Sequence, residues 1–175
     1  MTGRTYPDDI VDSFPQPPLS LTDEEGRDIR IESGGMDDFD ALVAMYDDFD
    51  PADRAQGIPP IKEGAIQEWL DTLLAEGSLN VVARHDDRVV GHAILVPGHE
   101  DAYELAVFVL DDYQGAGIGT KLLEGLLGHG VSKGVQRVWL TVERWNEPAV
   151  ALYEKLGFET SNAESFELEM SIRLG

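Results

Sequence analysis

Residues 103–120 combine a buried strand, a glycine-rich turn and the start of a helix, and no other stretch limits the fold so strongly. The apolar, β-branched run Leu105–Leu110 predicts a buried strand. Gly115, Gly117 and Gly119 follow at alternate positions, and the apolar residues after them recur at helical spacing. A glycine loop between a strand and a helix N-terminus can bind phosphate, because backbone N–H groups and the helix dipole point at one place.

Three phosphate-binding patterns compete for this loop. The P-loop needs Gly-Lys-Ser/Thr, but Thr120 directly follows the last glycine. The dinucleotide fingerprint needs a glycine at position 120, although Glu143 would suit its ribose contact, so that interpretation is weakened rather than excluded. The pattern Gln-x-x-Gly-x-Gly is complete, with Gln114, Gly117 and Gly119. A glycine-rich turn without any ligand is the remaining alternative.

A second stretch, residues 137–158, carries another recognisable pattern. A predicted strand, Val138–Val142, is followed by Asn146, which can cap a helix. Pro148 falls in the first helical turn and Gly157 at the C-terminal stop, where each residue type is favoured. From Asn146 to Phe158 the sequence reads Asn-x-x-Ala-x-x-Leu-Tyr-x-x-x-Gly-Phe.

Together the two motifs resemble the GCN5-related N-acetyltransferase (GNAT) family, over roughly residues 28–175. The resemblance implies an α/β (mixed α+β) fold: a mixed, largely antiparallel sheet of six to seven strands, helices on both faces, and a splayed pair of central strands. The hydrophobic patterns predict a compatible order: a strand, two helices, three strands, then helix, strand, helix and strand. The predicted strands are Asp28–Glu32, Leu79–Arg84, Val89–Pro97, Glu104–Leu110, Val138–Val142 and Ser165–Leu174.

The resemblance also implies acetyl-CoA as co-substrate. In this family the glycine loop holds the pyrophosphate, and the pantetheine arm lies between the splayed strands and pairs with the first of them. The residues implied in cofactor binding are Val107, Phe108, Val109, Gln114, Gly115, Ala116, Gly117, Ile118, Gly119, Thr120, Asn146 and Tyr153.

Two side chains are candidates for catalysis. An amine that attacks a thioester must lose a proton, and the thiolate that leaves needs a proton or a hydrogen bond. Tyr153 matches the family tyrosine that serves the leaving group, although it also fits an apolar helix stripe. Glu104 is the candidate base or else a solvated residue at a strand start; its segment looks like that of bacterial protein-lysine acetyltransferases. A backbone N–H, expected to be that of Val109, would stabilise the oxyanion.

Two function classes follow from these residues. The first is an acetyl-CoA-dependent N-acetyltransferase that acts on a primary amine: a protein lysine, a protein N-terminus or a small molecule. The second is a non-catalytic acyl-CoA or nucleotide-binding sensor module. The presence of both Glu104 and Tyr153 favours the enzyme, and the resemblance is compatible with a homodimer.

The chain is strongly acidic, with 34 Asp and Glu against 13 Lys and Arg and a formal net charge of −21. This charge repels nucleic acid and anionic membranes, so neither is expected as a partner. It could attract a basic substrate or mark disorder, but the acids are spread through a well-patterned chain, which favours adaptation to concentrated salt, as in a halophile.

There is no cysteine and the four histidines lack metal spacing, so we expect no metal. We expect His92 to be a strand residue with a local partner.

Residues 1–26 contain four prolines, several acids and no periodic pattern. We therefore expect an extended or partly disordered tail, followed by a single acetyltransferase domain at 27–175. No apolar run has membrane-spanning length and no signal-peptide pattern is present, so a cytoplasmic location is expected. The irregular loop Phe49–Ile61 carries Asp53 and Arg54, which could touch a substrate or face solvent.

Overall fold

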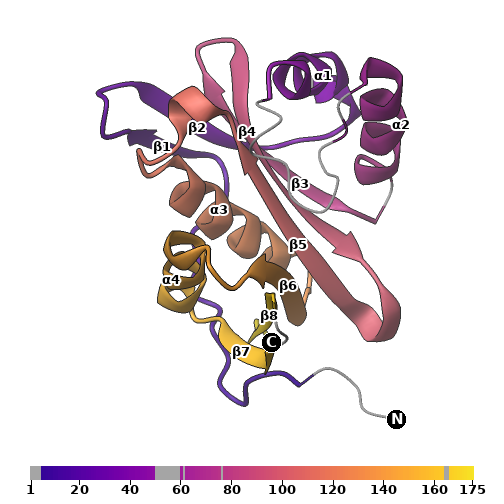
Figure 1. The fold of residues 1–175 in the computed structure, drawn as a ribbon, viewed down its shortest axis with the longest axis vertical. Helices are drawn as coiled ribbons and strands as arrows, with labels where there is room; N and C mark the ends of the chain where they lie inside the picture. Colours follow the sequence, from indigo (N-terminus) through magenta and orange to yellow (C-terminus); the bar gives the residue numbers. More distant parts are fainter. Residues whose placement is uncertain (1–4, 50–59, 61, 76, 164–165) are drawn as a thin grey trace.

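The computed structural model describes residues 5–49, 60, 62–75, 77–163 and 166–175. Within them, eight strands form one sheet in the order β1-β2-β3-β4-β5-β6-β8-β7 (Figure 1). All neighbouring strands are antiparallel except β5 and β6, which are parallel. The strands are β1 (Leu19–Thr22), β2 (Asp28–Ser33), β3 (Leu79–His85), β4 (Arg88–Pro97), β5 (Ala102–Val109), β6 (Arg137–Glu143), β7 (Glu159–Ala163) and β8 (Glu167–Arg173).

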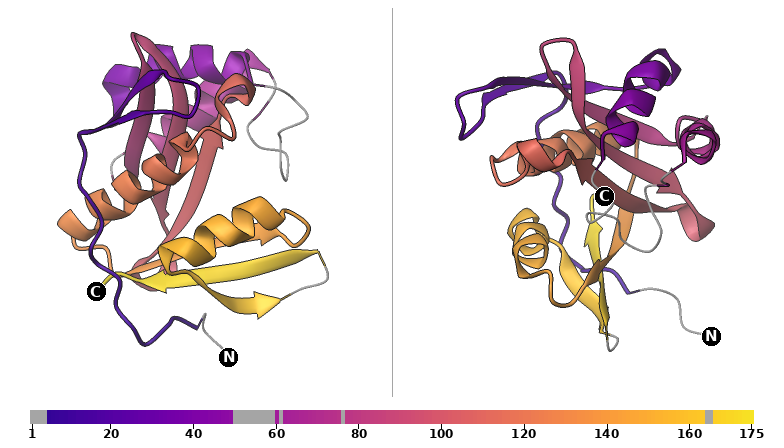
Figure 2. Two further views of the ribbon diagram at one scale, coloured as in Figure 1. Left: turned by 90° about the vertical axis from the view of Figure 1, so that its left-hand side faces the viewer. Right: turned by 45° about the horizontal axis from the view of Figure 1, so that its top comes forward.

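Helices cover both faces of the sheet. Figure 2 shows α1 (Phe39–Asp47) and α2 (Glu63–Leu73) on one face, and α3 (Ile118–Ser132) and α4 (Glu147–Leu156) on the other. This arrangement confirms the predicted mixed α/β fold with a largely antiparallel sheet. The predicted loop residues Asp53 and Arg54 lie outside the described residues.

The expected number of strands, six to seven, was too low. The additional strands are β1, which lies within the segment expected to be a tail, and β7, which directly follows the second motif. β1 has only four residues, and β7 is an edge strand whose residues are mostly exposed. Neither carries an apolar alternation long enough to identify a strand, because their positions depend on pairing with β2 and β8.

The central strands β5 and β6 separate after a short region of pairing. Only Ala102–Glu104 of β5 pairs with Arg137–Trp139 of β6, and beyond these residues the two strands diverge (Figure 2). The predicted splay is therefore confirmed. It divides the sheet into a part covered by α3 and a part covered by α4, which are joined at the narrow end of a V.

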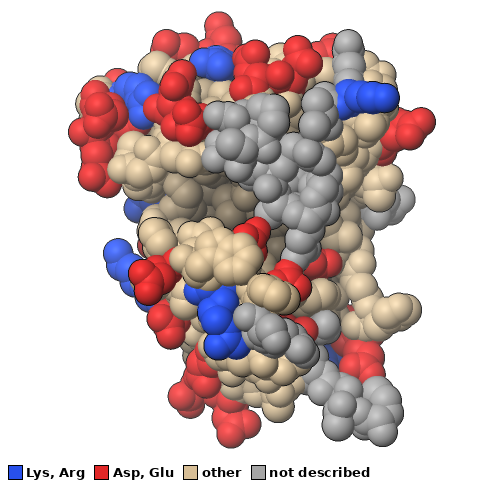
Figure 3. Space-filling view, viewed as in Figure 1, with Lys and Arg blue, Asp and Glu red and all other residues tan. Residues whose placement is uncertain are grey.

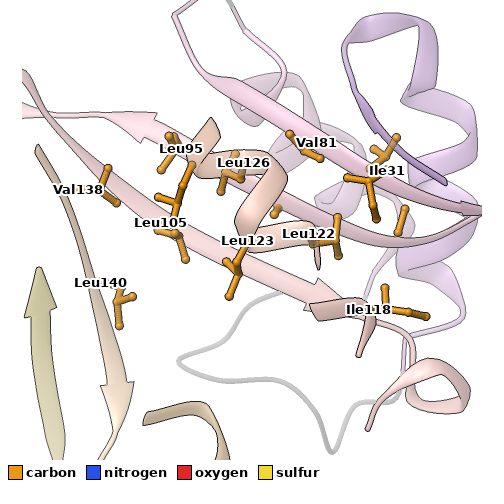
Figure 4. Packing of buried hydrophobic residues seen from close by; sticks show 14 of the residues in the cluster. Ile31, Val81, Leu95, Leu105, Ile118, Leu122, Leu123, Leu126, Val138 and Leu140 are labelled. Atoms are coloured by element: carbon orange, nitrogen blue, oxygen red, sulfur yellow. The ribbon is translucent and has the colours of Figure 1, made fainter. Parts of the chain in front are cut away.

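The main core lies between α3 and the sheet. The apolar face of α3 is fully buried against the strands, as Figure 4 shows, and each such side chain contributes about 1.5–3 kcal/mol relative to an exposed one. This core fixes the position of the glycine loop, because α3 begins immediately after it. The fully buried apolar α3 residues are Ile118, Leu122, Leu123, Leu126 and Leu127.

The segment 5–18 lies along the domain and contacts β8 in one part of the sheet and α3, which covers the other part. The Val11 N–H donates to the Arg173 carbonyl of β8 at 2.8 Å. Further along, the backbone of Pro15 lies against Gly128 of α3, where an added Cβ would overlap the Pro15 carbonyl oxygen. The glycine, a poor helix former, is explained by this close approach. No helix in the described part of the chain is long and apolar enough to span a membrane.

Candidate active site

The glycine loop lies at the carboxyl end of β5, where the short helix η4 (Asp111–Tyr113) leads toward α3. Gly115 and Gly117 have φ angles of +71° and +95°, in the left-handed region that favours glycine. Gly117 is the N-cap of α3, and the first turn of this helix contains no acidic residue. The first amides of a helix have no partner within it, so this end of α3 can hold a phosphate group.

The turn between β1 and β2 contacts the glycine loop. The Glu24 N–H donates to the Ala116 carbonyl at 3.1 Å. The Glu24 carboxylate oxygen Oε2 lies 3.7 Å from the position that a Cβ on Gly117 would occupy. The chain thus places one of its own carboxylates beside the proposed phosphate site.

A groove of about 330 Å³ occupies the splay between β5 and β6. The surface view shows this hollow above α4, with uncharged residues forming much of the visible wall (Figure 3). Seven of the predicted site residues line it, from three different regions of the chain. The lining residues are Phe49, Glu104, Leu105, Ala106, Val107, Phe108, Val109, Gln114, Thr141, Val142, Glu143, Asn146, Ala149 and Tyr153.

The backbone of β5 directs hydrogen-bonding groups into this groove. The Leu110 N–H donates to the Val90 carbonyl of β4 at 3.0 Å, so Leu110 faces β4. Because N–H directions alternate along a strand, Val107 and Val109 direct theirs away from β4, toward the gap. The Gln114 side chain closes one end of this edge, since its Nε2 donates to the Val109 carbonyl at 3.0 Å.

The two faces of β5 have different surroundings. Phe108 makes edge contacts with Tyr46 of α1 and Trp69 of α2, with ring centroids 5.6 and 5.5 Å apart. Glu104 lies on this same face, because side chains alternate along a strand, and it is exposed. Val107 and Val109 therefore belong to the face covered by α3.

Tyr153 brings a buried phenol to the groove. The residue is 8% exposed, and its ring packs edge-on against Phe158. Burial raises the pKa of Tyr153 to about 12, so the hydroxyl keeps its proton at all ordinary pH values. Tyr153 lines the groove, so its hydroxyl can donate a hydrogen bond there.

Asn146 has a structural role in addition to its place in the groove wall. Its Oδ1 accepts a hydrogen bond from the Ala149 N–H at 3.4 Å, as the N-cap of α4. The predicted cap, the first-turn proline and the C-terminal Gly157, with φ +110°, are all confirmed. These local signals fix α4, and α4 carries Tyr153 to the groove.

Part of the predicted cofactor set lies outside the groove lining. Gly115, Ala116, Gly117, Gly119 and Thr120 form the loop and the start of α3 at the end of β5. Ala116 is 3% exposed, and the adjoining Ile118 is fully buried in the core. These two residues can contact a ligand only through their backbone.

His92 is held in a buried polar network beneath the aromatic side of the groove. Tyr46 Oη donates to His92 Nδ1 at 2.6 Å, and His92 Nε2 donates to Asn80 Oδ1 at 2.7 Å. Asn80 Nδ2 in turn donates to the Leu73 carbonyl at 3.0 Å. Burial lowers the pKa of His92 to about 3, so the imidazole is neutral. The prediction of a strand histidine with local partners is confirmed.

Two polar side chains in the groove wall, Thr141 and Glu143, were not predicted as part of the acetyl-CoA site. Thr141 lines the wall beside Glu143, which the sequence suggests only for a ribose contact. The sequence pattern could have predicted them: the buried residues Val138, Leu140 and Val142 alternate along β6 with residues on the opposite face, which include Thr141 and Glu143. The described residues contain no group of three or more His, Asp or Glu that could hold a metal ion.

Comparison with known proteins gives a consistent family. The model of the acetyltransferase (GNAT) family matches residues 41–158. An uncharacterized N-acetyltransferase of Mycobacterium tuberculosis is 36% identical over 89 residues, which are 50% of this chain and 57% of that protein. The chain thus spans little more than half of that relative. The L-methionine sulfoximine/L-methionine sulfone acetyltransferase of Pseudomonas aeruginosa is 28% identical over 138 residues, 75% of this chain and 80% of that protein.

Solved structures share the fold. The GNAT domain of S. lividans PAT has a TM-score of 0.76 at 15% identity and covers 90% of this chain and 97% of its own. The structure of yncA from Salmonella typhimurium with its cofactor acetyl-CoA has a TM-score of 0.67 at 19% identity and covers 84% of this chain and 94% of its own. At these identities the likeness concerns the fold.

Proposed function

Since the chain belongs to the GNAT family of acetyltransferases, we propose that it moves an acetyl group from acetyl-CoA to a primary amine. The observation that carries this proposal is the groove at the β5–β6 splay. Three groups line this groove: the edge of β5, whose N–H groups face the gap, the buried hydroxyl of Tyr153, and the carboxylate of Glu104. In the proposed reaction the amine nitrogen bonds to the thioester carbon, the C–S bond breaks, and the amine proton is transferred away.

Cofactor binding rests on two features of the chain. The backbone of the glycine loop and the first turn of α3 suit the pyrophosphate, with no acid in that turn to oppose it. The edge of β5 at Val107 and Val109 suits the pantetheine arm, which would pair with it as an added strand. The Val109 N–H would also stabilise negative charge on the carbonyl oxygen during attack.

The Tyr153 hydroxyl would assist the leaving group by hydrogen bonding rather than by proton transfer. Its pKa of about 12 is well above the value of about 8.5 for an ordinary thiol, so a thiolate is too weak a base to remove its proton. A hydrogen bond from a buried donor still stabilises the developing thiolate. The proton that finally reaches the sulfur would come from the amine or from solvent.

Glu104 is the proposed general base, acting directly or through water. An amine with a pKa of about 8 (α-amine) to 10.4 (lysine) is mostly protonated near neutral pH, so a base is needed. Glu104 lies on the face of β5 opposite α3, where an acceptor could approach without crossing the cofactor edge. The acceptor could be a protein lysine, a protein N-terminus or a small amine; the lysine alternative rests on the likeness of the segment around Glu104.

The proposal is tested by thiol release from acetyl-CoA with a mixed pool of amines, together with cofactor binding by calorimetry. Gly117→Glu would block the pyrophosphate, but its positive φ would also strain the backbone. Gly119→Glu is the cleaner variant, because a Cβ there makes only an ordinary contact with Val109. Gly64→Glu, in open space on α2, adds the same group as a control. If folded Gly119→Glu binds acetyl-CoA as tightly as Gly64→Glu, the assignment of the loop is wrong.

A further inference from the structure

A second, smaller cavity adjoins the groove. It has a volume of about 210 Å³, below the 300–1,000 Å³ typical of a complete ligand site. Glu104 lines both this cavity and the groove. The other residues important here are Tyr6, Val96, Arg137 and Trp139. A cavity of this size beside the proposed base suits one end of an acceptor whose amine lies in the groove.

The sheet register places this cavity on the face of the sheet opposite α3, the face from which we propose that the acceptor approaches Glu104. Val96 of β4 is the Cα partner of Glu104, and Glu104 is the partner of Trp139 of β6. Residues paired across strands lie on the same face, so these three side chains form one row on the face opposite α3. Arg137 lies on that face too, two residues before Trp139.

Several arginines of this acidic chain are paired with carboxylates, whereas Arg137 and Arg173 donate to backbone carbonyls. Arg27, Arg30, Arg84 and Arg88 each have a carboxylate partner. In the described part of the molecule, Arg137 donates to the Glu100 carbonyl and lies over the Tyr6 ring, at 5.7 Å, but it contacts no carboxylate. Its remaining guanidinium donors can therefore serve an anion, for which the forked geometry of arginine is well suited.

Tyr6 supplies a second donor to the same cavity. Its hydroxyl is buried and has no hydrogen-bond partner among the residues described. A buried hydroxyl without a partner is unfavourable, so a ligand oxygen at this place would satisfy it. Val96, Pro97, Ala102 and Trp139 make part of the wall apolar, and His99, Glu100 and Glu104 complete the lining. The cavity thus combines donors for a carboxylate with a surface for an apolar side chain.

We propose that this cavity binds the carboxylate of an apolar α-amino acid, and that the amine of this acceptor is thereby held beside Glu104. The proposal rests on the acetyltransferase function and names its substrate class. The Cα atoms of Arg137 and Glu104 are diagonal neighbours across β5 and β6, about 7–8 Å apart. Both side chains line this cavity, so one acceptor that carries an amine and a carboxylate on the same carbon can contact both.

The test compares two acceptors that differ only in the carboxylate, L-leucine and isoamylamine. Arg137→Gln should lower the kcat/KM ratio of leucine to isoamylamine by about tenfold or more, through the KM for leucine. The KM for acetyl-CoA and the turnover of isoamylamine should not change. Because intrinsic amine reactivity is the same for both proteins, the change in the ratio reports carboxylate recognition. Arg30→Gln, which removes an exposed arginine on β2, is the matched control and should leave the ratio unchanged.

Two further variants guard against a merely structural effect. Arg137→Lys should keep part of the preference for leucine, because it keeps the charge but loses the fork. Tyr6→Phe removes only the hydroxyl and should also raise the KM for leucine. An equal loss of activity toward both acceptors in the Arg137 variants, or an unchanged ratio in all three, would overturn the proposal.

Leucine binding to the CoA-saturated protein, measured by calorimetry, separates this inference from the proposed function. Leucine binding that depends on Arg137 without any acetylation would support the cavity assignment and contradict the acetyltransferase activity. Acetylation of isoamylamine, with leucine no better and Arg137→Gln without effect, would support the activity and overturn the cavity assignment.

Discussion

Acid should weaken the fold through His92, which packs beneath the aromatic wall of the groove. Burial lowers its pKa to about 3, whereas an unfolded histidine titrates near 6.5. Below pH 6.5 the unfolded chain therefore takes up a proton that the folded chain does not accept until pH approaches 3. The contribution of His92 to stability is complete above pH 6.5 and is lost progressively between pH 6.5 and 3.

The size of this effect follows from the linkage relation. Each pH unit in that window is worth about 1.4 kcal/mol, so the fall from neutral pH to pH 5 should cost about 2 kcal/mol. That is a large part of the 5–15 kcal/mol that usually stabilises a domain. Protonation of carboxylates acts in the opposite direction here, because it relieves repulsion in a chain of net charge −21. The pH dependence of the unfolding free energy of the parent protein alone would therefore combine the protonation of His92 with that of the carboxylates.

His92→Gln separates them, because glutamine keeps a donor and an acceptor for Tyr46 and Asn80 but does not titrate. Urea unfolding of both proteins, followed by tryptophan fluorescence at fixed salt from pH 7.5 to 5, gives the difference in unfolding free energy. The advantage of the parent protein should shrink by about 2 kcal/mol toward pH 5. A difference that stays constant over this range would refute the argument that His92 is held neutral by burial.

Four further predictions concern the site and the surface. Tyr153→Phe should lower kcat by about 10²-fold with little change in acetyl-CoA affinity, and Glu104→Gln should remove the acidic limb of the pH–rate profile; an unchanged profile would exclude Glu104 as the base. Glu24→Gln should tighten acetyl-CoA binding about two- to fivefold, since it removes a charge beside the phosphate site; calorimetry showing equal or weaker binding would contradict this. Melting temperatures should rise from tens of millimolar to molar KCl, by about 2–4 °C for each kcal/mol of repulsion relieved; a flat or falling midpoint would argue against the salt-adapted surface that we propose for a halophile.

Charge arithmetic supports the salt prediction. With 34 acids against 13 Lys and Arg, the acidic side chains exceed the basic ones by 21. Figure 3 shows acidic side chains mainly along the upper, left and lower margins of the visible face, with basic ones between them. Screening of this repulsion should therefore favour the folded state, in which the charges lie closest together.

The sequence by itself determined much of this protein through local chain chemistry. Glycines at 115 and 117 are required by positive φ angles, and Asn146 and Gly157 delimit α4 because cap and stop signals act within a few residues. The spacing of the leucines in α3 indicates its buried stripe. Such features depend on neighbours in sequence, which is why the glycine loop, α4 and most strands were predicted correctly.

Only the tertiary structure decided where β5 and β6 part, how the segment 5–18 lies against Gly128, and that Arg137 and Tyr6 share a cavity with Glu104. Strands β1 and β7 were missed for the same reason. Each of these features depends on which distant segments pair or pack, and a short strand or a single arginine has no periodic signal that reports its partner. Local motifs predicted the glycine loop and Tyr153. The surroundings that would select an acceptor arise instead from contacts between residues more than thirty positions apart.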